Sequence, residues 1–335
     1  MAKKTNSSAQ KRRAPKKEKA VEVQAVVQEK KPAAKRGEEG IDIVVPMVFP
    51  GGGKWLEGYR KACAEEGIEP KIDERLRSWD LERYFFRGIA KFMPFVRKIH
   101  LIVSDDSQIP FWIDKEKIHI VLHEDIIPEE LLPTFNSSTI EMWLHRIEGL
   151  SETFIYCNDD MIATSPLTGE DFFIDGKPVT RCTERRVDTN IPFLKMCRTD
   201  LEIAAKDNGK KFDEGIILRD GHSYAPLLLS VLNETVEKHG KEMYDSCTTF
   251  RKAKNLNQYL YTLEQWLGGK CVNGNHAHRY FTLSTPYGDM SEIVLSGTAG
   301  VVCFNDGGIG SWTEMKAVVW RDLQTILGEK CEYEV

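Results

Sequence analysis

Apolar residues along this chain fall into short continuous runs and into longer runs at helical spacing. The short runs predict buried strands, at residues 41–48, 98–104, 117–122, 153–157 and 300–304. Apolar residues three and four apart predict helices, at residues 54–66, 79–93, 138–146, 191–207, 226–240, 256–267 and 313–327. Strands and helices alternate through the first half, which predicts an α/β fold with a mostly parallel sheet flanked by helices, and additional helices in the second half.

The strand predicted at 153–157 ends on three polar residues, Asn158, Asp159 and Asp160. Ligands of α/β proteins gather at the carboxyl ends of strands, and adjacent carboxylates are costly to hold there without a cation. The run therefore favours a site for a divalent metal and phosphate; the alternative is a solvated turn that closes the strand. Asn305 and Asp306 follow the strand predicted at 300–304 in the same way, so both strand ends are expected to face one crevice.

Two arginines, Arg83 and Arg87, lie four residues apart on the helix predicted at 79–93 and share a face. Their guanidinium groups suit bidentate phosphate contacts. The alternative is pairing with Asp80 and Glu82 on the same helix. Both interpretations remain open from the sequence.

His222 lies in a predicted loop before the helix expected from residue 226. A loop histidine near a helix start can act as a general base, although a single histidine is more often structural. Arg251 precedes another predicted helix and can neutralise a phosphate. His276 and His278 have the spacing of a metal pair on a strand, but the sequence offers no third ligand, so we interpret them as structural.

The glycines at 51–53 follow a predicted strand and precede a helix that starts near Lys54. They lack the spacing of a nucleotide-triphosphate loop, and Trp55 occupies the position of its Ser or Thr. A tight turn is the better interpretation.

The net charge of −5 hides a strong asymmetry. Residues 1–39 contain 12 Lys or Arg and 5 Glu, whereas the remainder contains 34 basic and 46 acidic residues. The first segment is predicted to be a disordered basic tail, either a solubilising tail or a contact for an anionic membrane surface. The acidic remainder, 40–335, argues against binding of nucleic acid.

The eight cysteines form no CxxC pair and no zinc spacing. No apolar run approaches the ~20 residues of a membrane-spanning helix, and no signal-peptide pattern is evident. A reducing, cytoplasmic location is expected, and if the basic tail contacts a membrane, that contact is expected at its inner face.

The stretch from Arg83 to Pro178 closely resembles the second conserved region of Stealth-family sugar-phosphate transferases. The matching segments include Arg83-Tyr84, Arg87, Pro94–Ile99, Gln108–Trp112, Leu132–Ser137, His145–Ile147, Gly149–Ser151, Phe154–Tyr156, Asn158–Met161, Asp171–Phe173 and Gly176–Pro178. The other three regions of the family are also recognisable, in Asp42 to Trp55, in His222 and Arg251, and in Cys303–Asp306.

The resemblance implies a GT-A-like catalytic domain over 40–335, and an enzyme that transfers a sugar 1-phosphate from a nucleotide diphospho-sugar to a glycan hydroxyl. Such enzymes release nucleoside monophosphate and make phosphodiester-linked capsular or surface polysaccharide. The implied catalytic residues are His222 as the base, with Asp159, Asp160 and Arg251. The implied ligands of Mg²⁺ or Mn²⁺ are Asp159, Asp160 and Asp306, and the implied substrate-binding residues are Asp42, Arg83, Arg87, Asn136 and Asn305.

The chain departs from the family pattern at several positions. Phe49, Pro50 and Gly52 replace two acids and a glycine of the first region, Tyr224 stands where a proline is usual, and Asn255 replaces an acid. Two alternatives therefore remain: a glycosyltransferase that releases nucleoside diphosphate, and a degenerate member that binds sugar nucleotides or glycans without turnover.

Overall fold

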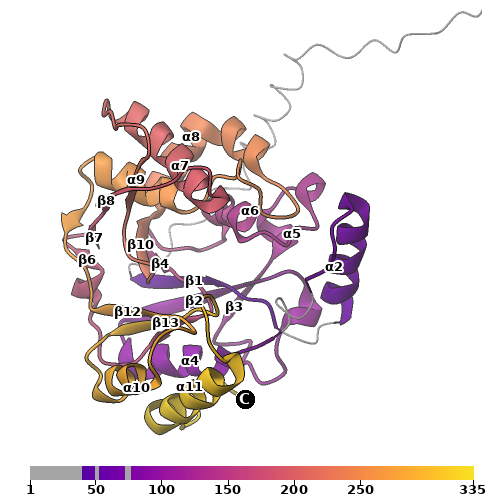
Figure 1. Ribbon diagram of the computed structural model, residues 1–335, viewed down its shortest axis with the longest axis vertical. Coiled ribbons are helices and arrows are strands. Elements are labelled where there is room, and N and C mark those ends of the chain that lie inside the picture. Colours follow the sequence, from indigo (N-terminus) through magenta and orange to yellow (C-terminus); the bar gives the residue numbers. More distant parts are fainter. Residues whose placement is uncertain (1–39, 50–52, 72–76) are drawn as a thin grey trace, which may run out of the picture.

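The computed structural model describes residues 40–49, 53–71 and 77–335. The expected basic tail, 1–39, and residues 50–52 of the expected glycine turn lie outside the described residues. A central sheet runs through the middle of the molecule with helices on both sides (Figure 1). Among the described helices, none has the length and apolar character needed to cross a membrane.

The central sheet has five strands in the order β10-β4-β1-β2-β3. These are β10 (Ala225–Leu228), β4 (Thr153–Tyr156), β1 (Ile41–Pro46), β2 (Val96–Val103) and β3 (His119–Leu122). Strands β4, β1, β2 and β3 are parallel, and β10 pairs antiparallel with β4 at one edge. The sequence-based expectation of a mostly parallel α/β sheet is therefore confirmed.

Successive residues of the central strands point into two different cores, because side chains alternate across a sheet. On β1, Ile43 and Val45 pack into one core and Val44 packs into the other. On β4, Ile155 and Phe154 divide in the same way. Both faces of the sheet are thus covered, which explains why its strands read as continuous apolar runs.

The helices form a layer on each side of the sheet (Figure 1). One layer contains α4 (Glu82–Phe92), α10 (Tyr287–Ser296) and α11 (Trp312–Leu327). The other contains α5 (His123–Ile126), α6 (Ser137–Glu141), α7 (Pro192–Asp207), α8 (Leu229–Ser246) and α9 (Tyr259–Leu267). Helix α2 (Gly53–Glu66) lies at the side of the molecule, where Trp55 and Tyr59 pack against Phe135 and Phe250.

Smaller sheets surround the central one. A three-stranded sheet contains β12 (His278–Phe281), β13 (Val301–Phe304) and β5 (Met161–Ala163). Another contains β11 (Val272–Asn273), β7 (Lys177–Thr180) and β6 (Phe173–Ile174). A two-stranded antiparallel sheet contains β8 (Thr183–Arg186) and β9 (Ile216–Arg219). Short 3₁₀ turns occur at η1 (Asp106–Gln108), η2 (Glu129–Leu131), η3 (Leu144–Arg146) and η4 (Gly169–Asp171).

Most of the long elements predicted from the sequence are confirmed, with ends shifted by a few residues, but two were wrong. The helix expected over 226–240 begins only at Leu229, because residues Ala225–Leu228 pair with β4 as an edge strand. Pro226 is tolerated there because an edge strand needs fewer backbone donors. The helix expected over 138–146 is α6 followed by the 3₁₀ turn η3; the break falls at Trp143, whose side chain is fully buried.

Arg83 and Arg87 bind neither of the two acids on their own helix. Both pair with Glu334 near the carboxyl end of the chain, whose carboxylate is fully buried. Arg87 donates two hydrogen bonds, with Nε 2.7 Å from Oε1 and Nη2 3.0 Å from Oε2, and Arg83 Nη1 lies 2.6 Å from Oε2. Burial raises the pKa of the Glu334 carboxyl, but hydrogen bonds from Arg87, the Cys331 N–H and Arg83 outweigh it and lower that pKa to about 2.

We predict that Glu334→Gln lowers the free energy of unfolding by about 3 kcal/mol at pH 7, because the carboxylate pKa falls from 4.5 in its ordinary state to about 2. A depressed carboxyl pKa stabilises the fold above the unfolded-state pKa, and this contribution is lost as the pH falls from about 4.5 to about 2. Urea unfolding of the two proteins should therefore differ by a constant amount above about pH 5.5, approach each other as the pH falls below about 4.5, and coincide only below about pH 2.

The matched control is Glu332→Gln, which removes an exposed ion pair to Lys117 with an N···O distance of 3.4 Å. It should change the free energy of unfolding by less than about 0.5 kcal/mol. Equal effects of the two substitutions would contradict a stabilising role for the Glu334 pair.

Candidate active site

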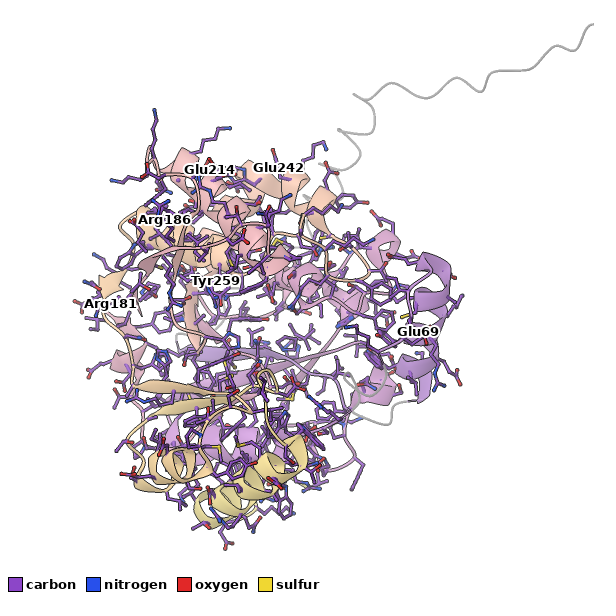
Figure 2. All side chains as sticks on the ribbon, in the orientation of Figure 1. Glu69, Arg181, Arg186, Glu214, Glu242 and Tyr259 are labelled. Atoms are coloured by element: carbon purple, nitrogen blue, oxygen red, sulfur yellow. The ribbon has the colours of Figure 1, made fainter. Side chains whose placement is uncertain are left out.

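A cavity of about 610 Å³ opens beyond the carboxyl end of β4. Most of its walls come from the segment between β4 and β5, from α6, from the loop after β9 and from the residues that open α9. Parts of β8, α7, β12 and the turn after β13 complete them. Tyr259, at the start of α9, is one lining residue. In the view of Figure 2 it lies below the helices drawn at the top and above the central sheet. This is the edge at which an α/β sheet usually binds ligands.

The two polar strand ends singled out in the sequence meet in this cavity. Strand β5 pairs antiparallel with β13, and beyond this pairing the Phe304 N–H donates to the Asp160 carbonyl at 2.9 Å. The Cys303 thiol donates to Oδ2 of Asp160 at 3.3 Å. Asn158, Asp160 and Asn305 all line the cavity, so the expectation that both ends face one crevice is confirmed.

The carboxyl groups at this edge are held in an environment that disfavours their charge. Burial raises the pKa of Asp160 to about 6, with a smaller contribution from the negative charge of Asp306. Burial, followed by the charges of Asp160 and Glu82, raises the pKa of Asp159 to about 7. One oxygen of Asp160, Oδ1, is buried and accepts no hydrogen bond. A cation or a hydrogen-bond donor in the cavity would satisfy that oxygen.

The donor groups around Asp160 fit a hard divalent cation better than a soft one. Ligand atoms of Asp160, His222 and Cys303 lie within 4.8 Å of one another. Burial raises the pKa of the Cys303 thiol far above neutral, and Asp160 raises it further, so the sulfur remains protonated and donates to the carboxylate. The remaining carboxylate oxygen suits Mg²⁺ or Mn²⁺. Asp306 is paired with Arg77, whose Nη2 lies 2.7 Å from Oδ2.

His222 lines the same cavity, in the loop between β9 and β10. Burial, then the positive charges of Arg219 and His278, lowers the pKa of its imidazole to about 4. The ring meets Tyr280 edge-on, with a centroid distance of 5.5 Å. At neutral pH the imidazole is therefore unprotonated, and a ring nitrogen can accept a proton.

Three arginines supply positive charge to the cavity. Arg251 was singled out from the sequence, and its Nη2 donates to Ser137 Oγ at 2.6 Å. Arg219 and Arg185 also line the cavity but were not singled out. The Arg219 guanidinium lies between the rings of Phe193 and Tyr259, with its carbon 5.0 and 4.7 Å from their centroids, and its Nε is buried without a hydrogen-bond partner.

Other lining residues also went unrecognised in the sequence. Glu141 belongs to a segment that read only as an amphipathic helix, yet its buried carboxylate accepts hydrogen bonds from the Gln258 N–H at 2.9 Å and the Tyr156 hydroxyl at 3.1 Å. His278, interpreted as structural, lines the cavity, whereas His276 is buried and contacts Ser223 Oγ at 2.7 Å. For Arg219, the sequence did contain a signal: the polar run Arg219–His222 follows a short apolar strand.

Of the expected site residues, Asp160, His222, Arg251 and Asn305 line the cavity. Asp159 and Asp306 neighbour the lining without belonging to it, and Arg83 and Arg87 are engaged with Glu334 instead. Two further expected residues, Asp42 and Asn136, lie elsewhere in buried networks.

Asp42 is fully buried on β1. Its carboxylate accepts hydrogen bonds from Arg97 Nε at 2.8 Å, from Arg97 Nη2 at 2.5 Å and from the Ser151 N–H at 2.9 Å, and His100 Nε2 lies 3.0 Å away. Burial opposes the charge, but the hydrogen bonds from His100 and Arg97 outweigh it and lower the pKa of Asp42. This network ties β1 to β2 and to the segment before β4.

Asn136 begins α6, accepting from the Ser138 N–H at 3.1 Å. Its Nδ2 donates to Asn255 Oδ1 at 3.1 Å. Asn255 in turn donates to the Ser246 carbonyl at 2.5 Å and to Thr248 Oγ1 at 2.8 Å. An amide at position 255 satisfies these acceptors, which an ionised carboxylate cannot do. The departure from the family pattern at this position therefore has a local structural reason.

Comparison with known proteins matches the middle of the chain to one family model. The model for "Stealth protein CR2, conserved region 2" matches residues 75–180. The receptor polysaccharide phosphotransferase of Streptococcus oralis is 32% identical over 309 residues, covering 80% of this chain and 90% of that protein. The capsular polysaccharide phosphotransferase of Streptococcus pneumoniae is 31% identical over 306 residues, covering 79% and 90%. The exopolysaccharide phosphotransferase of Lactiplantibacillus plantarum is 40% identical over 145 residues, covering 42% of each chain.

Among solved structures, the apo form of mouse xyloside xylosyltransferase 1 matches with a TM-score of 0.38 at 12% identity, over 79% of this chain and 98% of that one. The galactosyltransferase LgtC, in complex with donor and acceptor sugar analogues, matches with a TM-score of 0.35 at 14% identity, over 87% and 98%. These scores are too low to establish a common fold.

The contact between Cys303 and Asp160 predicts a measurable pKa. The Asp160 carboxyl should titrate near pH 6, because burial disfavours its charge. Cys303→Ala removes a hydrogen bond that favours the charged form, so the pKa should rise from about 6 to about 7. Carbon NMR titration of labelled aspartate carboxyl groups, with Asp160→Asn to assign the signal, measures both values.

Cys63→Ala is the matched control, because Cys63 is a buried thiol in the aromatic cluster around α2. It should leave the titration of Asp160 unchanged. A wild-type Asp160 that titrates near pH 4 would show that the carboxyl is solvated rather than buried.

Proposed function

This chain belongs to the Stealth family, and on that premise we propose that it transfers a sugar 1-phosphate from a nucleotide diphospho-sugar to a hydroxyl group of a glycan acceptor, releasing nucleoside monophosphate. Its curated relatives are named as receptor, capsular and exopolysaccharide phosphotransferases. The product would be a phosphodiester-linked capsular or surface polysaccharide. The observation that carries the proposal is one cavity that contains Asp160, His222 and three arginines.

The bond changes follow from the chemistry of the donor. The acceptor hydroxyl oxygen attacks the phosphorus next to the sugar, and the bond from that phosphorus to the bridging oxygen of the pyrophosphate breaks. The sugar phosphate is joined to the acceptor, and the nucleoside monophosphate leaves with the bridging oxygen. A base must accept the hydroxyl proton, and cations must neutralise the charge on the phosphates.

His222 is the proposed base because its imidazole is unprotonated at neutral pH. Burial and the neighbouring cations lower its pKa in the free protein, and an anionic donor bound beside it would raise that pKa again. The base would therefore gain proton affinity when the phosphates are present. Arg219, Arg251 and Arg185 are the proposed phosphate-binding cations, with Arg219 preoriented by Phe193 and Tyr259.

A divalent metal is part of the proposal. Asp160, with its unpaired Oδ1, would hold Mg²⁺ or Mn²⁺, and Asp159 and Asp306 are the neighbouring acids expected to contribute. The ion would neutralise charge on the pyrophosphate. Asn305, which lines the cavity and accepts from the Gly307 N–H at 2.9 Å, is a proposed contact for the donor.

The basic segment at 1–39 lies outside the described residues. Its contact with an anionic membrane surface therefore stays a prediction, as do the substrate-binding roles of Asp42, Arg83, Arg87 and Asn136. The structure gives these four residues buried partners within the chain.

The released nucleotide tests the reaction type. We expect that a panel of nucleotide sugars, incubated with the protein, a glycan acceptor and Mg²⁺ or Mn²⁺, yields nucleoside monophosphate by mass spectrometry. Release of nucleoside diphosphate would instead show glycosyl transfer. Tight donor binding by calorimetry without any product over hours would show a binding protein that lacks turnover.

Substitution of cavity residues tests the assignment of roles. His222→Gln should lower kcat/KM by roughly 10²–10⁴-fold, because the acceptor proton loses its base. Asp160→Asn should also lower the rate, and added Mn²⁺ should not restore it. The control is Asp175→Asn, in an exposed turn between β6 and β7 where the left-handed backbone (φ 50°) tolerates Asn. If nucleoside monophosphate release persisted undiminished in His222→Gln and Asp160→Asn, these two roles would be wrong.

A further inference from the structure

A second group of ligating side chains lies outside the proposed active site, between three helices of the layer that contains α5 to α9. It consists of Asp207 at the end of α7, His239 on α8 and Glu264 on α9. Their ligand atoms all lie within 4.8 Å of one another. The imidazole Nε2 of His239 is 2.8 Å from Asp207 Oδ2.

Glu264 makes this group more than an acidic surface cluster. The residue is only 6% exposed, and its Oε1 is buried without a hydrogen-bond partner. Its other oxygen, Oε2, accepts from Asn208 Nδ2 at 3.2 Å. Burial and the nearby Asp207 carboxylate raise the pKa of Glu264. A cation would satisfy this vacant oxygen and offset the charge of the two neighbouring acids.

We propose that Asp207, His239 and Glu264 bind a divalent transition-metal ion of the zinc class, which joins α7, α8 and α9. One imidazole nitrogen and two carboxylate oxygens are a donor set that suits Zn²⁺, with water as the fourth ligand. Neighbouring ligand atoms of a tetrahedral zinc ion lie roughly 3.3 Å apart, given bonds of about 2.0–2.1 Å. Small side-chain rotations therefore suffice to reach this geometry.

The surroundings of the three residues provide both support and competition. The hydrogen bond from Asn208 holds the Glu264 carboxylate in place, as outer-shell partners do in metal sites. Side chains of Asp207 and His239 are each 14% exposed, which leaves a path for the ion from solvent. Lys238 Nζ lies 3.4 Å from Asp207 Oδ2 on a half-exposed side chain, so it competes with the ion and can move into water.

The position of the ion gives it a consequence for the cavity. Helix α9 begins with Tyr259, which lines the cavity, and carries Glu264 further along the same helix. Helix α7 likewise carries the lining residue Phe193 near its start and Asp207 at its end. An ion held by Asp207 and Glu264 ties α7 to α9 and so restrains the two aromatic rings that enclose Arg219.

The test uses the whole chain, stripped of metal with a chelator and titrated with Zn²⁺ by calorimetry. Asp160→Asn serves as the background, because the cavity group of Asp160, His222 and Cys303 is another place for a metal. We expect one Zn²⁺ site to remain in Asp160→Asn, and the unfolding midpoint to rise by several degrees with Zn²⁺. Binding of Co²⁺ there should show no thiolate charge-transfer band, since none of the three ligands is a cysteine.

Substitutions of the proposed ligands and of the neighbouring Lys238 should change Zn²⁺ affinity in opposite directions. In the Asp160→Asn background, His239→Gln and Glu264→Gln should each weaken Zn²⁺ binding by at least about 100-fold and abolish the rise in unfolding midpoint. Lys238→Gln should tighten binding severalfold, because it removes a competing cation. Glu234→Gln, which breaks an exposed pair with Lys270, should change nothing.

Folding defects are separable from loss of the site. Glu264→Gln is isosteric and removes a disfavoured buried charge, so its unfolding midpoint in chelator should equal or exceed that of the background protein. Zn²⁺ binding that survives His239→Gln, or that disappears entirely with Asp160→Asn, would overturn the proposal.

Discussion

The pairing of β5 with β13 is the constraint on which the rest of the site depends. It brings Asn158–Asp160, at the end of a strand of the central sheet, beside Asn305 from a separate small sheet. Joined by the main-chain hydrogen bond between Phe304 and Asp160, the two strand ends form one polar wall of the cavity.

Asp160 and the cations of the cavity come from different elements of the fold. Asp160 lies between β4 and β5, where the backbone is fixed by strand pairing on both sides. The cations are Arg185 on β8, Arg219 on β9 and Arg251 in the loop before α9. These elements pack against the helical layer that contains α7 and α9. A reaction that spreads negative charge over phosphates needs both groups to be held before substrate arrives. The two layers provide such preorganisation because each is anchored in its own hydrophobic core.

The sequence was informative where local pattern decides structure. Buried strands, long helices and the polar residues after β4 and β13 could all be found, because burial leaves apolar runs and a strand end leaves a break in them. The partners of Arg219, Glu141 and Arg87 could not. Each is a residue far along the chain, respectively Tyr259, Gln258 and Glu334, and a single sequence holds no record of such distances. The strand that contains Pro226 was missed because its pairing with β4, rather than its own propensity, makes it extended.

The two arginines of α4 show how a matched motif can mislead about phenotype. Their guanidinium groups are occupied by a carboxylate from the end of the chain. A substitution at Arg87 breaks this pairing and would therefore lower the amount of folded protein in a cell, whatever its effect on turnover. Steady-state protein abundance should therefore be compared before any such variant is classified as catalytically dead.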